Sequence, residues 1–310
     1  MRASTDLRPT VGLIGLGNMG APIADRILDA GYALVVFNRT PQKTREVVAR
    51  GALAAESPED LARRADIVLT SLADDRALED VAAQVLPSAQ PDATLVDLST
   101  VSPAASARVA ALADAASVGY LRAPVSGNPT VVRAGNLTLI VSGPRSAFER
   151  AEDVLRSIGP TIHYLGEGEE ARIVKLAINL MIAGLAELMA EALVLGESAG
   201  VDRAKLLEVM GSSAAGAPFV KYKTEPLLRD DYSATFTTAL MEKDVDLILE
   251  AAAGAGIELP LATAMKQLVR AAVDDGYGDH DFLALYLKLR KASGLDPAVA
   301  PGSRVGVQSG

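Results

Sequence analysis

The sequence predicts an α/β domain with a parallel sheet, followed by an all-α domain, the two linked by a long interdomain helix. Three observations favour this fold class. The chain of 310 residues is long enough for two domains of ordinary size. Its first half alternates short apolar runs with helical patterns, which is typical of βαβ units. From Glu169 onward the strand-like runs stop, and only helical patterns follow.

In the first half, continuous apolar runs predict strands that are buried on both faces of a sheet. The clearest runs are Val11–Gly15, Leu34–Asn38, Ile67–Leu72 and Leu95–Ser99. Helices are expected to begin near Asn18, Pro41, Ser57, Asp74 and Pro103. Three later strands are expected at Tyr120–Val125, Leu137–Ser142 and Thr161–Leu165.

The second half has helical periodicity alone. A long helix is expected from Ala171 to Gly200, where the Ala199-Gly200 pair is a stop signal. Further helices are expected at Arg203–Met210, Leu240–Gly254, Leu261–Asp274 and Phe282–Ala292. We therefore predict an α/β domain over residues 1–166, a helical domain over 167–295 and a flexible tail over 296–310, which is rich in Pro, Gly, Ser and Val.

Composition excludes several classes of function. The net charge of −9 repels a polyanion, so nucleic acid is not an expected partner. The absence of cysteine excludes disulfides, thiolate metal sites and a cysteine nucleophile. The two histidines, His163 and His280, have no ligand partner by spacing, so we expect no metal. The first residues do not resemble a secretory signal, and two glutamates and an asparagine interrupt the longest apolar stretch. We expect a cytoplasmic protein without a membrane span.

The segment Gly15–Gly20 fits the pattern G-x-G-x-x-G between a strand and a helix. The first glycine allows a tight turn, the second lets the backbone approach a pyrophosphate, and the third lets the helix pack on the sheet. The helix N-terminus then faces the phosphates. This context indicates a Rossmann dinucleotide-binding domain. The expected cofactor-binding residues are Gly15, Leu16, Gly17, Asn18, Met19 and Gly20.

The end of the second strand predicts which dinucleotide binds. An NAD enzyme would place Asp or Glu there to accept hydrogen bonds from the adenosine ribose. This chain has Asn38, Arg39 and Thr40 instead. A guanidinium pairs with a phosphate dianion and stacks on adenine, whereas the alternative interpretation of Arg39 is a solvated arginine that starts a helix. We expect NADP(H), bound in part by these three residues.

Five ordered motifs resemble the β-hydroxyacid dehydrogenase family, which includes 3-hydroxyisobutyrate, tartronate semialdehyde and succinic semialdehyde reductases. The resemblance covers residues 10–292. The motifs are Gly15–Gly20, Asp97–Pro103, Ala123–Gly127, Gly166–Gly168 leading to Lys175 and Asn179, and Lys243-Asp244. The resemblance implies a Rossmann domain, a long interdomain helix and a helical second domain through which the chains form homodimers or homotetramers.

Lys175 and Asn179 are four residues apart in a helical pattern, so they share one face. A lysine on a largely apolar helix either extends its ammonium to water or takes part in chemistry. The resemblance implies the second role, because the family's catalytic lysine and its helper asparagine match these two positions. The alternative for Asn179 is a hydrogen bond between helices.

The loop of Ser126, Gly127 and Asn128 follows a strand, where a parallel sheet presents its carboxyl edge to ligands. The resemblance implies that this loop binds the substrate's acid group. The family pattern continues with a second glycine, but this chain has Asn128 followed by Pro129. That departure leaves the identity of the substrate open, and a plain turn is the alternative interpretation.

The resemblance also implies cofactor contacts further along the chain. Thr100 would touch the ribose or nicotinamide, although a cap for the helix at Pro103 is compatible with that role. Leu72 and Ala73 are expected to line the path of the cofactor. Lys243 and Phe236 would reach it from the helical domain. Lys221, Tyr222 and Lys223 are open to two interpretations, contact with an anionic substrate or a charged surface.

The sequence therefore predicts an NADP-dependent oxidoreductase that interconverts a small, anionic 3-hydroxy acid and its semialdehyde or keto acid, with Lys175 as acid and base. A 3-hydroxy amino acid similar to D-threonine is one alternative substrate, because the Asn128 amide oxygen could accept from its ammonium group. An imine reductase shares this fold, but such enzymes usually replace the lysine. A non-catalytic NADP-binding module is an alternative of another class.

Overall fold

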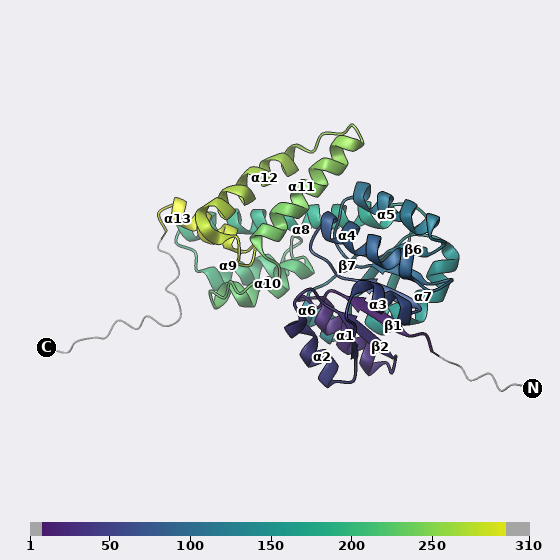
Figure 1. The fold of residues 1–310 in the computed structure, drawn as a ribbon. Helices are drawn as coiled ribbons and strands as arrows, with labels where there is room; N and C mark the ends of the chain where they lie inside the picture. Colours follow the sequence, from purple (N-terminus) through teal and green to yellow (C-terminus); the bar gives the residue numbers. More distant parts are fainter. Residues whose placement is uncertain (1–7, 296–310) are drawn as a thin grey trace, which may run out of the picture. The chain divides into compact units, whose positions relative to one another are not determined.

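The structure is a computed structural model that describes residues 8–295 (Figure 1). The tail expected at 296–310 lies outside the described residues. Contact clustering divides the chain into two compact units between Ala177 and Ile178, inside the long helix α8 (Glu170–Ser198). The first two turns of α8 therefore belong to the N-terminal unit, together with all the strands.

The N-terminal unit is built on a six-stranded parallel sheet with the order β3-β2-β1-β4-β5-β6. The order reverses between β1 and β4, and ligands of such sheets bind outside the carboxyl ends of the strands at this switch point. The strands are β1 (Val11–Ile14), β2 (Leu34–Phe37), β3 (Leu53–Ala54), β4 (Ile67–Thr70), β5 (Thr94–Asp97) and β6 (Gly119–Arg122).

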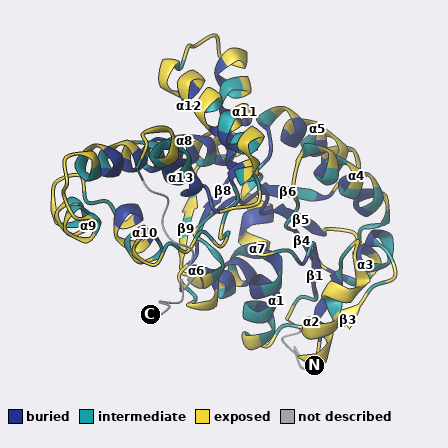
Figure 2. Cartoon of the chain, turned by 90° about the vertical axis from the view of Figure 1, so that its left-hand side faces the viewer, coloured by how far each residue is buried: buried dark blue, intermediate teal, exposed yellow. Residues whose placement is uncertain are grey.

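Helices cover both faces of this sheet, because its strands are apolar on both sides. Helices α1 and α7 share one apolar core with alternate strand residues such as Leu13 and Leu69. Helices α3, α4 and α5 share the other core with the residues between them, such as Ile14 and Val68. Figure 2 shows β1, β4 and β5 buried between helices whose outer faces are exposed. The helices are α1 (Gly20–Asp29), α2 (Arg45–Ala49), α3 (Pro58–Arg64), α4 (Asp75–Val85), α5 (Pro103–Ala115), α6 (Pro129–Arg133) and α7 (Arg145–Ile158).

The strand expected over Tyr120–Val125 is wrong as a single element. The chain leaves the large sheet after β6 and enters a second sheet as β7 (Val125–Ser126), which pairs antiparallel with β8 (Thr138–Val141). Pro124 lies at the break and has no N–H to continue the ladder. Strand β9 (Thr161–Tyr164) completes the second sheet, parallel to β8.

The C-terminal unit is helical. No strand follows β9 in residues 8–295, as the sequence predicts. The sequence did not indicate α10, which has Pro218 at its start and Pro226 inside it. The helices after α8 are α9 (Arg203–Ser212), α10 (Pro218–Leu228), α11 (Thr238–Gly254), α12 (Pro260–Ala272) and α13 (Ala284–Ala292), with a π turn at Val273–Tyr277.

Helix α8 is long and apolar enough to cross a membrane when only length and composition are considered, with a mean hydropathy of 1.8 over its most apolar window. About four tenths of that window is buried within the protein (39%). A core helix of a soluble protein meets the same criteria, so this is weak evidence for a membrane span.

Candidate active site

The glycine loop after β1 is shaped by close backbone contacts. Gly15 has φ +98°, and a Cβ there would lie 2.2 Å from the carbonyl oxygen of Ser71. A Cβ on Gly20 would lie 1.9 Å from the carbonyl oxygen of Gly15, whereas a Cβ on Gly17 would meet no atom within 4 Å. No side chain caps the N-terminus of α1 at Met19. Open space at the second glycine and an uncapped helix N-terminus fit the pyrophosphate of a dinucleotide.

Asn38 connects this loop to the end of β2. The backbone N–H of Leu16 donates to Asn38 Oδ1 at 2.9 Å, and Asn38 Nδ2 donates to the carbonyl oxygen of Thr40 at 3.0 Å. Both ends of the amide are therefore engaged within the protein. Arg39 and Thr40 are exposed beyond the carboxyl end of β2. The structure thus separates Asn38, which shapes the loop, from Arg39, whose side chain faces solvent.

The loops after β4 and β5 lie at the neighbouring carboxyl ends. Leu72 is half-buried, Ala73 is exposed, and the N–H of Leu72 donates to Ser99 Oγ at 2.9 Å. Thr100 is half-buried but does not cap α5. The cap is Ser102, whose Oγ accepts from the N–H of Ala105 at 3.0 Å. Pro103 occupies the first position of the helix, so the N-cap is the residue immediately before it.

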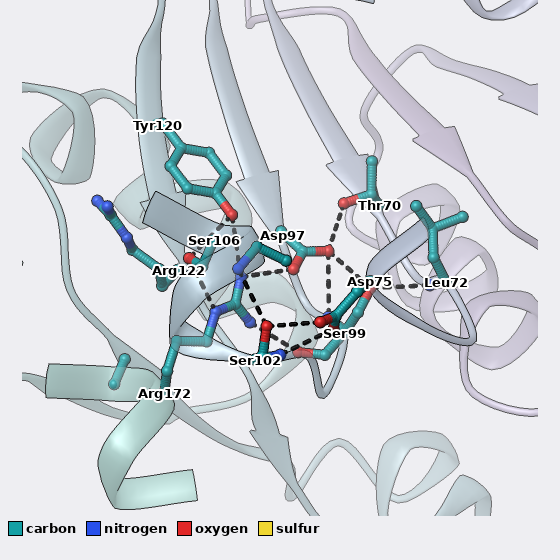
Figure 3. A network of polar contacts seen from close by, with 12 residues as sticks. Thr70, Leu72, Asp75, Asp97, Ser99, Ser102, Ser106, Tyr120, Arg122 and Arg172 are labelled. Atoms are coloured by element: carbon teal, nitrogen blue, oxygen red, sulfur yellow. Dashed lines mark hydrogen bonds and ion pairs between the residues drawn. The ribbon is translucent and has the colours of Figure 1, made fainter. Parts of the chain in front are cut away.

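A buried arginine, which sequence analysis missed, connects these loops to α8 (Figure 3). Arg172 and Asp97 are 1% and 0% exposed and form an ion pair at 2.5 Å. Burial acts to lower the pKa of Arg172, but Tyr120 and Asp97 raise it above its ordinary value, so the guanidinium stays charged. The only sequence signal was an arginine on an apolar helix, three residues before Lys175.

Lys175 is half-buried on α8, and Asn179 is buried one turn further along. Asn179 Nδ2 donates to Asp244 Oδ2 on α11 at 2.5 Å. The Lys243 ammonium lies 3.1 Å from Asp244 Oδ1, with a geometry that gives an ion pair but no hydrogen bond to that oxygen. The hydrogen bond between helices foreseen for Asn179 is therefore present, and it fixes the plane of the amide.

The substrate loop begins in β7, where Ser126 is half-buried. Gly127 has φ +144°, a conformation that favours glycine. Asn128 has an extended φ of −116° and is the N-cap of α6, since its Oδ1 accepts from the N–H of Val131 at 3.0 Å. The amide oxygen on which the amino-acid alternative depends is thus already engaged as a helix cap.

In the C-terminal unit, Phe236 packs edge-on against Phe282, with ring centroids 5.9 Å apart. Lys223 is 3% exposed and pairs with the buried carboxylate of Asp281 at 2.8 Å. The surface-charge interpretation of Lys223 is wrong, because its ammonium is buried against Asp281. This ion pair gives no support to the substrate contact. The partner lies 58 residues away along the chain, so local sequence could not indicate it. Over residues 8–295, no group of three or more His, Asp or Glu side chains could hold a metal ion.

Two family models match successive parts of the chain. Residues 10–166 match the family model for the NAD binding domain of 6-phosphogluconate dehydrogenase. Residues 169–289 match the model for the NAD-binding region of NADP-dependent 3-hydroxyisobutyrate dehydrogenase.

Relatives match along almost the whole chain. The 2-(hydroxymethyl)glutarate dehydrogenase of Eubacterium barkeri is 31% identical over 92% of this chain and 96% of its own. The NAD-dependent L-serine dehydrogenase of Pseudomonas aeruginosa is 32% identical over 88% of this chain and 95% of its own. The solved structure of Mycobacterium tuberculosis 3-hydroxyisobutyrate dehydrogenase with L-serine has a TM-score of 0.83 and 30% identity, over 91% of this chain and 99% of that one.

Proposed function

We propose a function from one premise, that the chain belongs to the β-hydroxyacid dehydrogenase family. It is an oxidoreductase of the hydroxyacid dehydrogenase type and takes a nicotinamide cofactor. The finer proposal is that it uses NADP(H) to interconvert a small 3-hydroxy acid and its semialdehyde or keto acid. The observation that supports this most is the placement of Lys175 and Asn179 four residues apart on α8, with the Asn179 amide held by buried Asp244.

The bound nicotinamide accepts or supplies the hydride. Reduction of a carbonyl leaves charge on its oxygen, and the Lys175 ammonium donates a proton there. In the oxidation direction, the neutral amine of Lys175 accepts the hydroxyl proton. Asn179 cannot titrate, and its fixed amide orients the hydroxyl or the lysine. The Ser126 hydroxyl and the Gly127 N–H bind the substrate carboxylate in this proposal.

The preference for NADP is a proposal that rests on Arg39. Its guanidinium follows β2 where an NAD enzyme would place an acid, and it is exposed and able to meet a 2′-phosphate. Asn38 supports this preference, because its amide bonds to Leu16 in the glycine loop and to Thr40, the residue after Arg39. The resemblance also implies that Leu72, Ala73 and Thr100 of the N-terminal unit and Phe236 and Lys243 of the C-terminal unit contact the cofactor, and each is kept as a proposed cofactor contact.

We also propose a cytoplasmic homodimer or homotetramer. On α8, Met181, Leu188 and Leu195 are 68%, 59% and 73% exposed. Their spacing of seven residues places them along one side of the helix. An exposed apolar stripe of this kind favours association with a second copy of the chain.

A 3-hydroxy amino acid is the second candidate substrate. The relative from P. aeruginosa is named an L-serine dehydrogenase, and L-serine is present in the structure from M. tuberculosis. Asn128 Oδ1 accepts from the N–H of Val131 as a helix cap, which lends no support to a second role as the acceptor for a substrate ammonium group. A hydroxy acid without an amino group therefore remains the first candidate.

The Lys175→Ala variant tests the proposed chemistry. Loss of the acid and base should lower kcat by about 10²- to 10⁴-fold. We expect the dissociation constant of NADPH, measured by fluorescence titration, to change by less than about threefold, because the glycine loop is untouched. Lys205→Ala, which removes an exposed lysine on α9, is the matched control and should keep wild-type kcat. Full activity of Lys175→Ala would refute the role.

A further inference from the structure

We propose that Arg172 is a positioning residue, which holds Lys175 in register with the loops that follow β4 and β5. The proposal rests on the proposed acid and base role of Lys175. All the contacts that support it lie within the N-terminal unit, and Figure 3 shows their arrangement.

Arg172 connects α8 to the carboxyl end of β5. The Arg172 guanidinium donates to Asp97 Oδ2 at 2.5 Å and to the carbonyl oxygen of Ser99 at 2.7 Å. It also donates to Tyr120 Oη at 3.1 Å and to Ser106 Oγ at 3.2 Å. Four acceptors from β5, its following loop, β6 and α5 thus fix one fully buried side chain. The carbonyl of Ser99 directly precedes Thr100, which is a proposed cofactor contact.

The Asp97 carboxylate is also connected to β4. Asp97 Oδ1 accepts from Thr70 Oγ1 at 2.6 Å and from Ser99 Oγ at 2.6 Å. Ser99 Oγ in turn accepts from the N–H of Leu72 at 2.9 Å. A continuous chain of hydrogen bonds therefore runs from Leu72 through Ser99 and Asp97 to Arg172.

Arg172 and Lys175 are only three residues apart on α8. Three residues of α-helix rise only about 4.5 Å and place both side chains on neighbouring sides of the helix. Any shift of α8 against the β4 and β5 loops would move the Lys175 ammonium by a similar amount. A misplacement of about 1 Å can lower a rate by about 100-fold.

The buried ion pair of Arg172 and Asp97 contributes geometry rather than stability. A buried ion pair is weak evidence for stability, because well-packed apolar residues often stabilise a fold as well or better. A planar guanidinium with several fixed acceptors specifies orientation, which apolar packing does not. The pair is therefore better explained by the geometry that it imposes on α8 and the two loops than by stability alone.

The test uses four variants of the full chain. Arg172→Lys keeps the charge but loses the planar fork. Arg172→Met leaves Asp97 buried without its partner and should lower Tm strongly. Arg172→Met with Asp97→Asn removes both charges and keeps an amide oxygen that can accept from the Thr70 and Ser99 hydroxyls, so it should recover most of the Tm. Arg108→Met removes an exposed arginine that pairs with Glu79 on the surface, and is the matched control.

We expect the double variant to keep kcat about 10- to 100-fold below wild type despite its recovered Tm. Arg172→Lys should fall in the same direction by a smaller factor. The primary kinetic isotope effect with 4-deuterated NADPH should rise in both, because hydride transfer becomes more rate-limiting. Arg108→Met should match wild type in all three measurements.

A double variant with wild-type kcat and an unchanged isotope effect would overturn the inference and leave the network with a structural role only. Failure of the proposed function looks different, because it would appear as a fully active Lys175→Ala enzyme. The inference fails on its own when Lys175→Ala is inactive and the double variant is fully active.

Discussion

Asn38 and Arg39 are adjacent in the sequence, yet the structure separates their roles. The Asn38 amide is engaged at both ends and stabilises the glycine loop from the side of β2. The Arg39 side chain is exposed beyond the carboxyl end of β2. At the scale of single residues, cofactor preference should therefore change with Arg39 without loss of the loop's shape.

Arg39→Ala tests this separation. A charge-assisted hydrogen bond contributes about 1.5–3 kcal/mol, so kcat/KM with NADP⁺ should fall by about 10- to 100-fold. The value with NAD⁺, which has no 2′-phosphate, should change by less than about threefold. Arg76→Ala, at a side chain that is 91% exposed, should change neither value. A variant whose kcat/KM falls equally with both cofactors would show that Arg39 does not read the 2′-phosphate.

The residues that sequence analysis identified share a local signal. Glycines between a strand and a helix, and a lysine and an asparagine four residues apart, can be recognised within one short window. The polar partners of Arg172 and Asn179 have no such signal, because these carboxylates lie 75 and 65 residues away. No local pattern predicts such partners, so the positions of Asp97 and Asp244 became clear only in the structure.

At the scale of elements, the sequence predicted the sheet better than its connections. The runs of β1, β2, β4 and β5 are mainly apolar, so burial on two faces made them recognisable. The two-residue strand β3 is too short to give a period. Helix α7 was missed although Ala147, Phe148, Ala151, Val154, Leu155 and Ile158 are buried at helical spacing, a signal that was present in the sequence.

Helix α8 also contains Glu187, an acid in an apolar helix. Burial and the neighbouring Glu191 raise the pKa of Glu187 to about 7. The folded pKa exceeds the ordinary value of 4.5, so the unfolded chain ionises first as pH rises. This side chain therefore costs nothing well below pH 4.5, lowers the free energy of unfolding progressively between about pH 4.5 and 7, and keeps that cost above pH 7.

Glu187→Gln should remove this cost. Because the side chain is only half-buried and solvent screens its charge, we expect a gain of about 1–2 kcal/mol in the free energy of unfolding at pH 8. The gain at pH 5 should be less than half as large. Urea unfolding at the two pH values measures both, with Glu208→Gln on the surface of α9 as the control. An equal effect at the two pH values would contradict the assigned cause.

At the scale of the whole molecule, the chain combines a unit with a nucleotide-binding topology and a helical unit. The N-terminal unit contains the glycine loop, Ser126 and Lys175, whereas the C-terminal unit contains Asn179 and Lys243. The two family models divide the chain in the same order. The fold class was predictable because strand-like runs and helical patterns alternate in the first half of the sequence and only helical patterns follow. The substrate was not, because Asn128, the departure from the family pattern, caps α6 and does not indicate what the loop binds.

The proposed reaction is tested most directly by the absorbance at 340 nm, followed with each cofactor and a panel of substrates. The panel consists of 3-hydroxyisobutyrate, 2-(hydroxymethyl)glutarate, L-serine, D-threonine and a cyclic amine as the probe for imine chemistry. We predict that NADPH forms with at least one 3-hydroxy acid, at a higher kcat/KM than NADH. Tight NADP⁺ binding without turnover of any hydroxy acid, or turnover of the amine alone, would contradict the proposed function.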